Sequence, residues 1–492
     1  MSSFLTKLAR LPASISGAPL PPLPAAASSE ASFTEATAPT AALPLPTLSG
    51  RPSLDELHDR IARIVARDVP PPPRADPTRG ELPFVLQHTP TGPLYLHRAR
   101  SALGARVGRA PLYAAVHADP AMLALLALDP VLAGCDPRRA LYLDTETTGL
   151  AGGTGTVPFL LGLAWLDPET NLFVLEQALL RRLGEEAPIL DLLTERLAQA
   201  SMIVTYNGKA FDMPLLRTRY VMNRVPKPVE PPHLDLVHMA RRIHRTRLKH
   251  RTLVAVEEEV LGRGRVGDVA GGDIVATYAH FLRTGDDEAL LGVVEHNGAD
   301  VLAMVALVGL YGEPLGERIE GEGEIDYAPA ALDGSDLAAA ASVLRRAGAY
   351  DKADTFANAA LSRGGGASAR RARGDIAKAR GDKARALADY EVLASEVDDA
   401  GVRLELAKLY EHHVRAFDKA LGVLSRGTGE ETGAMEKRRL RLQKKLDRAE
   451  AAAAPVPTPA PAAPKRRKKA VRSNGTLLLA LGVDLVGEAE SK

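Results

Sequence analysis

Apolar runs of strand length alternate with helical patterns between about Ala140 and Tyr311, and this alternation limits the fold more than any other feature of the 492-residue chain. The strand-like runs are LYLD, VPFLLGLAWLD, NLFVLEQALL and MIVTYN, with a turn at Asp167–Asn171 between the middle two. The helical patterns are EEAPILDLLTERLAQA and DMPLLRTRYVM. A strand hairpin followed by helix, strand and helix predicts an α/β domain, with a mixed sheet and helices on its faces.

Acidic residues stand at the ends of these predicted strands. Asp144 and Glu146 are two residues apart, so their side chains point to the same face of a strand and can bind the same ion. Asn207 follows MIVTY, and Asp212 begins the next helical pattern. The carboxylates would then meet at one edge of the sheet and form a metal site. Two simpler interpretations stay open, a solvated strand end for Asp144 and Glu146 and a helix cap for Asp212.

A histidine and a further aspartate share one face of a later helix. His296 and Asp300 are four residues apart in the amphipathic pattern EHNGADVLAMVALVGL. We expect His296 to act as a base beside a metal ligand. Because the ligands offer hard oxygen atoms, and the chain has one cysteine and no HExxH motif, Mg²⁺ or Mn²⁺ is favoured over Zn²⁺. Asp235 is expected to organise a local turn, with a supporting acidic role as the alternative.

Three segments resemble, in order, the motifs of the DEDD superfamily of 3′-5′ exonucleases, which have a ribonuclease H-like fold: LYLDTETTGL, YNGKAFD and HNGAD. The stretch from Leu141 to about Leu307 is similar, more specifically, to YprB-like ribonuclease H-like proteins, through HLDLVHMARRI, LVAVEEEVLG and DIVATYAHFL between the motifs. The last motif departs from the superfamily, which usually has Tyr-x3-Asp or His-x4-Asp. Here His296-x3-Asp300 places a histidine at the tyrosine spacing.

The resemblance implies a phosphodiester hydrolase that uses two ions of Mg²⁺ or Mn²⁺ and acts on nucleic acid as a 3′-5′ exonuclease. The implied metal ligands are Asp144, Glu146, Asp212 and Asp300, and the implied base is His296. Two such ions would activate a water molecule and stabilise the leaving 3′ oxygen.

Nucleic-acid contacts are expected from one basic segment, RRIHRTRLKHR, which runs from Arg241 to Arg251. The formal net charge of the chain is only +1, so affinity for nucleic acid has to come from a local patch. The candidate contacts are Arg241, Arg242 and Arg245, together with Asn207. A solvated helix face is the alternative for the arginines. The expected substrate is single-stranded DNA or RNA, and no base-reading motif distinguishes the two.

The region beyond Gly334 contains helical patterns and a short internal repeat. The triplet Asp-Lys-Ala begins at residues 351, 382 and 418, so it recurs after 31 and 36 residues. These steps bracket the period of roughly 34 residues that is typical of tetratricopeptide hairpins. The pattern predicts tetratricopeptide-like repeats that bind a protein partner, with a generic alanine-rich bundle as the alternative.

Two functions from different classes follow from these patterns. The first is the metal-dependent exonuclease, which the presence of all four acidic residues favours. The second is a catalytically inert ribonuclease H-like scaffold that binds nucleic acid or protein through its helical repeats.

The glycine-rich run Gly262–Gly267 matches the pattern GxGxxG of nucleotide-binding loops. It follows the helical pattern RTLVAVEEEVL, whereas the nucleotide-binding loop requires a preceding strand. Gly262 is therefore expected to end a helix.

The chain divides into six predicted segments. They are a disordered Ala/Pro-rich tail (1–52), an N-terminal extension leading into the catalytic domain (53–138), the ribonuclease H-like exonuclease domain (139–312), a linker (313–333), the tetratricopeptide-like repeats (334–448) and a Pro/Ala-rich basic tail (449–492). The run Lys465–Lys469 is either a nucleic-acid contact or a solvated stretch. One cysteine, Cys135, and the lack of an apolar run of about 18 residues predict a cytoplasmic protein without a disulfide or a membrane span.

Overall fold

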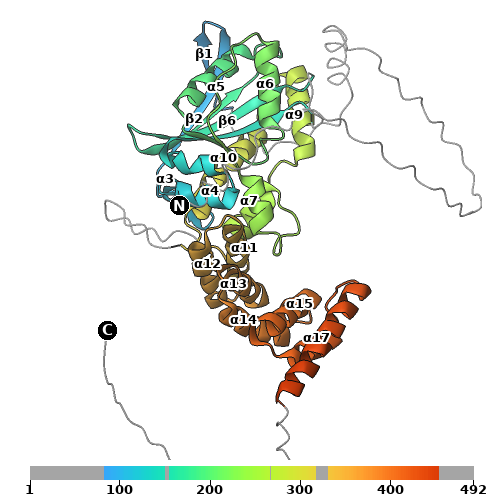
Figure 1. The fold of residues 1–492 in the computed structure, drawn as a ribbon. Helices are drawn as coiled ribbons and strands as arrows, with labels where there is room; N and C mark the ends of the chain where they lie inside the picture. The colour runs from blue at the N-terminus through green and yellow to red at the C-terminus, as the bar shows by residue number, and fades with distance from the viewer. Residues whose placement is uncertain (1–81, 150–154, 266, 317–330, 454–492) are drawn as a thin grey trace, which may run out of the picture.

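The structure, a computed structural model, describes residues 82–149, 155–265, 267–316 and 331–453 (Figure 1). The predicted tail 1–52 lies outside the described residues, as do most of the predicted linker 313–333 and of the predicted tail 449–492. The described chain has two parts, a sheet covered by helices and a column of helices attached to it (Figure 1).

A mixed sheet of seven strands forms the first part and confirms the fold class predicted from the sequence. Its order is β1-β2-β7-β6-β5-β8-β9, in which β5, β8 and β9 are parallel and all other neighbours are antiparallel. The strands are β1 (Val85–Thr89), β2 (Gly92–Ser101), β5 (Ala140–Thr147), β6 (Pro158–Asp167), β7 (Leu172–Leu179), β8 (Met202–Thr205) and β9 (His233–Asp235). A separate two-stranded sheet consists of β3 (Arg106–Val107) and β4 (Ala110–Pro111).

Strands β1 and β2 are not predicted from the sequence, which assigns residues 53–138 only to an extension before the domain. Strand β2 pairs with β7 along its length, from Tyr95 opposite Leu179 to Ser101 opposite Phe173. Leu94 and Leu96 of β2 are buried, whereas their neighbours are partly exposed. This alternation is the pattern of a strand that is covered on one face. The extension therefore completes the sheet.

Helices cover both faces of the sheet because its central strands carry apolar side chains on both sides. Along β5, Ala140 and Tyr142 belong to one core, whereas Leu141 and Leu143 belong to the other. The helices that contribute to the first core are α3 (Tyr113–Val116), α4 (Pro120–Ala127), α7 (Leu236–Ile243), α8 (Leu253–Val256), the π-helical turn η3 (Glu257–Leu261) and α10 (Leu291–Gly312). The helices of the second core are α5 (Ala187–Gln199), α6 (Asp212–Met222) and α9 (Gly271–Thr284), together with the first turn of α10. Short 3-10 turns occur at Pro130–Gly134, Pro137–Arg139 and Glu288–Leu290.

Helix α10 is the central helix of the first part. Within the described residues, Glu288–Gly312 is the one helical stretch long and apolar enough to cross a membrane, and 67% of its apolar window is buried inside the protein. Val301, Met304 and Val308 are fully buried in the first core, against the sheet and α3. The apolar side chains of α10 are thus used in core packing.

The second part is a series of helical hairpins, as the sequence predicts. Its described elements are α11 (Gly334–Arg346), α12 (Tyr350–Ser362), α13 (Gly366–Arg380), α14 (Lys383–Glu396), α15 (Ala400–Leu409), the π-helical turn η5 (Tyr410–Val414), α16 (Phe417–Ser425) and α17 (Thr432–Ala453). Each Asp-Lys-Ala triplet lies at the start of the second helix of a hairpin, in α12, α14 and α16. The assignment of these hairpins as tetratricopeptide units stays a prediction.

The first hairpin is joined to the sheet part by a shared core and by buried polar contacts. Leu337 and Leu344 of α11 lie in the same core as α10. Asp336 is fully buried, 3.0 Å from His244 Nδ1 and 2.6 Å from Arg247 Nη2. Burial raises the pKa of Asp336, but the contacts with His244 and Arg247 outweigh burial and lower it. These contacts hold α11 in a defined position beside α7.

Candidate active site

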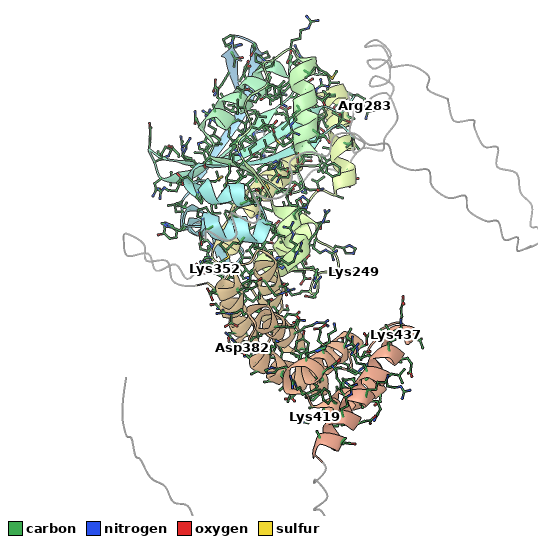
Figure 2. All side chains as sticks on the ribbon, viewed as in Figure 1. Lys249, Arg283, Lys352, Asp382, Lys419 and Lys437 are labelled. Carbon is green, nitrogen blue, oxygen red and sulfur yellow. The ribbon has the colours of Figure 1, made fainter. Side chains whose placement is uncertain are left out.

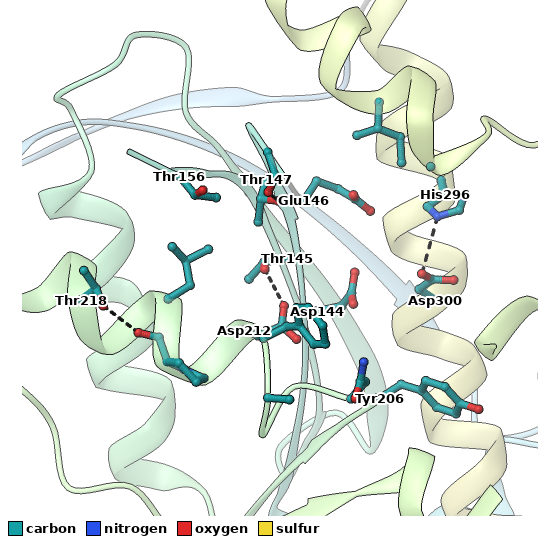
Figure 3. A pocket seen from close by; sticks show the side chains of 18 residues that line it. Asp144, Thr145, Glu146, Thr147, Thr156, Tyr206, Asp212, Thr218, His296 and Asp300 are labelled. Carbon is teal, nitrogen blue, oxygen red and sulfur yellow. Dashed lines mark hydrogen bonds and ion pairs between the residues drawn. The ribbon is translucent and has the colours of Figure 1, made fainter. Parts of the chain in front are cut away.

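One pocket of about 510 Å³ gathers the acidic residues predicted from the sequence (Figure 3). Strand β5, the connection from β8 to α6, and α10 each supply part of its wall. The predicted site residues that line it are Asp144, Glu146, Asn207, Asp212, His296 and Asp300. The three motifs, which span more than 150 residues of sequence, therefore meet at one place.

Sheet topology explains this meeting. Strands β5, β8 and β9 are parallel, so their carboxyl ends lie at the same edge of the sheet. Tyr142, Asp144 and Glu146 follow one another at intervals of two residues along β5, so their side chains lie on the same face of the strand. The side chain of Tyr142 packs in the core that contains α10. Both carboxylates thus point toward α10.

Asp144 is held by a buried amide of α10. Asn297 Nδ2 donates a hydrogen bond of 2.9 Å to Asp144 Oδ2, and Asn297 Oδ1 accepts one of 2.9 Å from Gln177 Nε2. Gly162 of β6 faces Asp144, and a Cβ atom there would lie 2.2 Å from Asn297 Oδ1. Gly162 is thus required for the close approach of α10 to the sheet. The roles of Asn297 and Gln177 are not predicted from the sequence, although Asn297 lies inside HNGAD.

Asp212 belongs to the pocket and does not cap α6. The helix begins at Asp212, and its capping residue, Phe211, makes no side-chain capping bond, so the helix-cap interpretation is wrong. Thr145 Oγ1 donates a hydrogen bond of 2.5 Å to Asp212 Oδ1 (Figure 3). This bond ties the start of α6 to the end of β5.

Asp235 organises a turn, as predicted. Its side chain is 3% exposed and accepts hydrogen bonds from the backbone N–H groups of Asn207, Lys209 and Val237. Asn207 has a φ of 71°, a left-handed conformation that asparagine adopts more readily than most residues. The turn places Asn207 at the wall of the pocket.

His296 is oriented by a carboxylate that is not predicted from the sequence. His296 Nδ1 lies 2.6 Å from Asp268 Oδ1, and His296 Nε2 lies 3.6 Å from Asp300 Oδ2. A proton on Nδ1, donated to Asp268, leaves the lone pair of Nε2 on the side of the pocket. The signal for Asp268 in the sequence is weak, because it stands in an irregular segment far from His296 along the chain.

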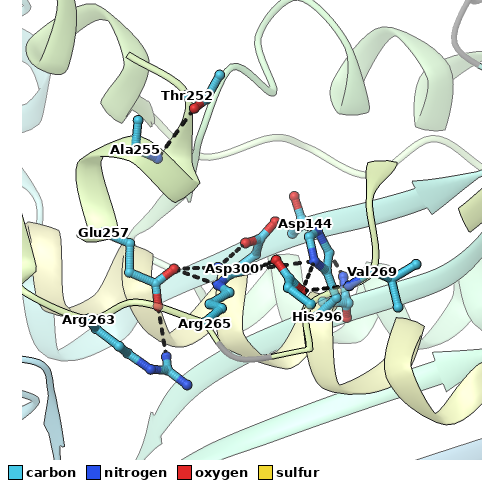
Figure 4. Close-up of polar contacts among 11 residues, drawn as sticks. Asp144, Thr252, Ala255, Glu257, Arg263, Arg265, Val269, His296 and Asp300 are labelled. Atoms are coloured by element: carbon cyan, nitrogen blue, oxygen red, sulfur yellow. Dashed lines mark hydrogen bonds and ion pairs between the residues drawn. The ribbon is translucent and has the colours of Figure 1, made fainter. Parts of the chain in front are cut away.

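An arginine supplies positive charge behind the pocket, through its contact with Asp300 (Figure 4). Arg265 is 7% exposed, pairs with Asp300 and lies 2.5 Å from Oε2 of Glu257, which is fully buried. Arg265 stands in the glycine-rich run, where Gly262 ends the η3 turn with a φ of 71°, as predicted. The sequence predicts that a helix ends at Gly262, but it does not predict the contact between Arg265 and Asp300.

The carboxylates of the pocket repel one another. Burial raises the pKa of Asp144, and the charges of Asp300, Glu146 and Asp212 raise it further, against the hydrogen bond from Asn297. Burial also raises the pKa of Glu146 to about 7 and that of Asp212 to about 6. Negative charge crowded in this way favours the binding of a cation.

The donor atoms of the pocket fit a divalent metal ion. Glu146, His296 and Asp300 each offer a ligand atom, and these three atoms lie within 4.8 Å of one another. Asp144 and Asp212 add further carboxylate oxygens to the same pocket. An oxygen-rich set of this kind suits a hard cation.

The predicted arginine contacts lie outside this pocket. Arg241 and Arg245 are exposed, and Arg242 is half-buried, with Nη1 donating to the carbonyl oxygens of Leu126 and Ala127. All three arginines line a separate groove beside α11. The structure therefore brings the acidic residues, His296 and Asn207 together but places these arginines elsewhere.

Comparison with known proteins agrees with this geometry. Residues 141–311 match a family model described as the RNase_H superfamily. The chain is 38% identical over 176 residues to the uncharacterized protein YprB of Bacillus subtilis (strain 168), a match that covers 35% of this chain and 42% of YprB. The chain thus matches less than half the length of that relative. Residues 141–311, with the acidic pocket at the carboxyl edge of their parallel strands, form a domain of the ribonuclease H superfamily.

Proposed function

We propose that this protein is a metal-dependent 3′-5′ exonuclease that hydrolyses single-stranded nucleic acid. The observation that carries the proposal is the convergence of four carboxylates and one histidine on a single open pocket, in a ribonuclease H superfamily domain. The crowded carboxylates cost the fold stability, and an inert scaffold gains nothing from that cost. A bound cation converts the same charges into favourable contacts.

Asp144, Glu146, Asp212 and Asp300 would hold two divalent ions, Mg²⁺ or Mn²⁺. Such ions, when bound, supply the charge that activates a water molecule and stabilises the leaving oxygen. Asn297 and Thr145 orient Asp144 and Asp212 through hydrogen bonds of 2.9 Å and 2.5 Å, so these carboxylates are held in place before substrate binds.

His296 is the base of the proposed reaction. Its Nε2 atom takes a proton from the attacking water, while Asp268 stabilises the imidazolium that forms. The water oxygen bonds to phosphorus, the bond from phosphorus to the 3′ oxygen breaks, and the leaving oxygen takes a proton from solvent. The products are a nucleoside 5′-monophosphate and a strand shorter by one nucleotide.

Aromatic side chains at the pocket support a single-stranded substrate. Phe211 is 58% exposed although it is a large apolar residue, and it lines the pocket together with Tyr206. Exposed aromatic rings beside a phosphodiester site provide surfaces on which unpaired bases stack. A terminal nucleotide separated from its strand partner would have access to the exposed ring of Phe211.

The direct test is incubation of 5′-labelled single-stranded DNA and RNA with Mg²⁺ or Mn²⁺. A ladder of labelled products shortened from the 3′ end is expected, with a loss of at least about 100-fold in rate for Asp144→Asn. Glu169→Gln, in the exposed turn between β6 and β7, is the matched control and keeps the parent rate. A ladder that persists in Asp144→Asn reveals a contaminant, and an absence of cleavage with both substrates favours the inert scaffold.

A further inference from the structure

A second groove, of about 440 Å³, lies where the sheet part meets the helical part. Three of its arginines come from α7 and the residues just after it, and three come from α11 and α13. They are Arg241, Arg242, Arg245, Arg345, Arg346 and Arg371. The groove is thus a basic surface that neither part of the chain forms alone.

Most of this positive charge is not neutralised by the protein. Among the described residues, Arg241, Arg245 and Arg346 have no ion pair, and the buried Nε atom of Arg345 has no hydrogen-bond partner. Burial lowers the pKa of Arg242, and the neighbouring charge of Arg346 lowers it further. A cluster of like charges around an unpartnered buried donor indicates an anion site.

The acidic group in the groove is engaged elsewhere. Asp375 is the one carboxylate among the described residues that line the groove, and its Oδ1 atom accepts a hydrogen bond of 2.6 Å from Tyr390. Arg371 has a partner, Asp399, at 3.3 Å, but both side chains are more than 40% exposed. An exposed pair of this kind contributes little and exchanges readily for another anion.

The remaining lining suits a nucleic-acid backbone better than a base. Three serines, Ser335, Ser342 and Ser368, and several alanines fill the space between the arginines, and no aromatic side chain lines the groove among the described residues. Small side chains let a chain approach closely, and the arginines supply the hydrogen bonds to phosphate oxygens, because Ser342 and Ser368 already donate to the backbone carbonyls of Ala338 and Gly365. The groove has no ring on which a base would stack.

Helix α7 connects the groove with the acidic pocket. Its eight residues span about 12 Å, from Asp235, which positions Asn207 at the pocket, to the arginines at its end. In the proposed complex, a strand of a few nucleotides spans this length.

We propose that this groove binds the phosphate backbone of a single nucleic-acid strand whose 3′ end lies in the acidic pocket. The proposal rests on the proposed function for the identity of the substrate. It gives the helical part a role in substrate binding, through Arg345, Arg346 and Arg371. These contacts are independent of base sequence, so DNA and RNA both bind.

The test is equilibrium binding of a fluorescent single strand of about 12 nucleotides, measured by anisotropy in EDTA at several salt concentrations. The groove variant is Arg345→Ala/Arg346→Ala/Arg371→Ala. The control variant removes the same charge from α17, through Lys437→Ala/Lys444→Ala/Arg448→Ala (Figure 2). EDTA prevents metal-dependent cleavage, so binding is measured whether or not the pocket is catalytic.

The expected result is a selective change in salt dependence. Each lost phosphate contact lowers the slope of log K against log salt by about 0.7, so the groove variant should lose about 2 in slope. With equal affinity at 1 M salt, this corresponds to about 100-fold weaker binding at 0.1 M salt. The control variant should keep the parent slope, and arginine-to-lysine substitutions at the three groove positions should restore most of it.

Four outcomes overturn the proposal. Three of them are a groove variant with the parent slope, an equal loss of slope in the control variant, and no binding of the strand by the parent. The fourth is retained binding in Arg245→Ala/Arg346→Ala, which changes only exposed side chains and therefore serves if the triple variant fails to fold. If the parent cleaves neither substrate in Mg²⁺ but the groove variant still loses binding selectively, the proposed exonuclease activity is wrong and the assignment of the groove stands.

Discussion

The charge of Glu146 is predicted to destabilise the metal-free protein at neutral pH, so Glu146→Gln should be more stable than the parent. Burial and the neighbouring Asp300 and Asp212 raise the pKa of Glu146 from 4.5 to about 7, against the opposing charge of His296. Between these two pH values the folded state holds a proton that the unfolded state releases. The free energy of unfolding therefore falls as pH rises from about 4.5 to 7, and the penalty is complete above pH 7.

The size of the effect follows from the same two values. A rise in pKa from 4.5 to about 7 corresponds to about 3 kcal/mol, and this is an upper value because the side chain is only partly buried. For a cooperative unit of this size, it amounts to about 5–10 °C in the midpoint of thermal unfolding. Glutamine keeps the shape of the side chain and removes its charge.

Thermal unfolding in EDTA at pH 5 and pH 8 measures this difference. Glu146→Gln should melt above the parent at pH 8 and close to the parent at pH 5. Addition of Mg²⁺ at pH 8 should raise the parent midpoint and remove most of the difference, because binding to the folded state is stabilising. Glu169→Gln, which is exposed, should match the parent throughout. Equal midpoints for Glu146→Gln and parent at pH 8 would refute the reasoning.

Three further substitutions test the residues that surround and support the pocket. Asp268→Asn should lower kcat by about 10–100-fold with little change in KM, because His296 loses its charged partner; a parent-like kcat would show that His296 acts without Asp268. Gly162→Ala should cost about 1–3 kcal/mol in urea unfolding, since the new Cβ presses on Asn297, and unchanged stability would contradict that packing. Arg265→Ala should cost about 3 kcal/mol by leaving buried Glu257 short of a partner. The double variant with Glu257→Gln should regain part of that loss, and no recovery would argue against the pair.

The local features of the fold are those that the sequence predicts well. The run LYLD and the runs that follow it become β5 to β8, since a strand buried on both faces is recognisable from its continuous apolar side chains. Strand β2 is buried on one face only, and its alternation of Leu94 and Leu96 with polar residues is a weaker signal. For the same reason, the extension before Ala140 is not recognised as part of the sheet.

Some residues of the candidate site are likewise predictable from the sequence, and others are not. Asp144, Asp212 and Asp300 are predictable because each lies at the end of a strand or on a helix face, in a motif only a few residues long. Arg265 and Asp268 come from an irregular segment, and nothing in its local pattern indicates that it folds back against α10. Their positions depend on how the chain packs, which periodicity does not encode.

The sequence by itself determined that this chain has an α/β domain with four acidic residues at a strand end, at a helix start and on a helix face, followed by helical hairpins. These properties follow from the spacing of side chains within short segments, where periods of 2 and 3.6 residues reflect backbone geometry. Only the tertiary structure decided that Arg265 pairs with Asp300 and that Arg241 faces the arginines of α11 and α13 across one groove. Contacts of this kind join segments that are distant in sequence, and the packing of α7 and α11 in a shared core brings them together.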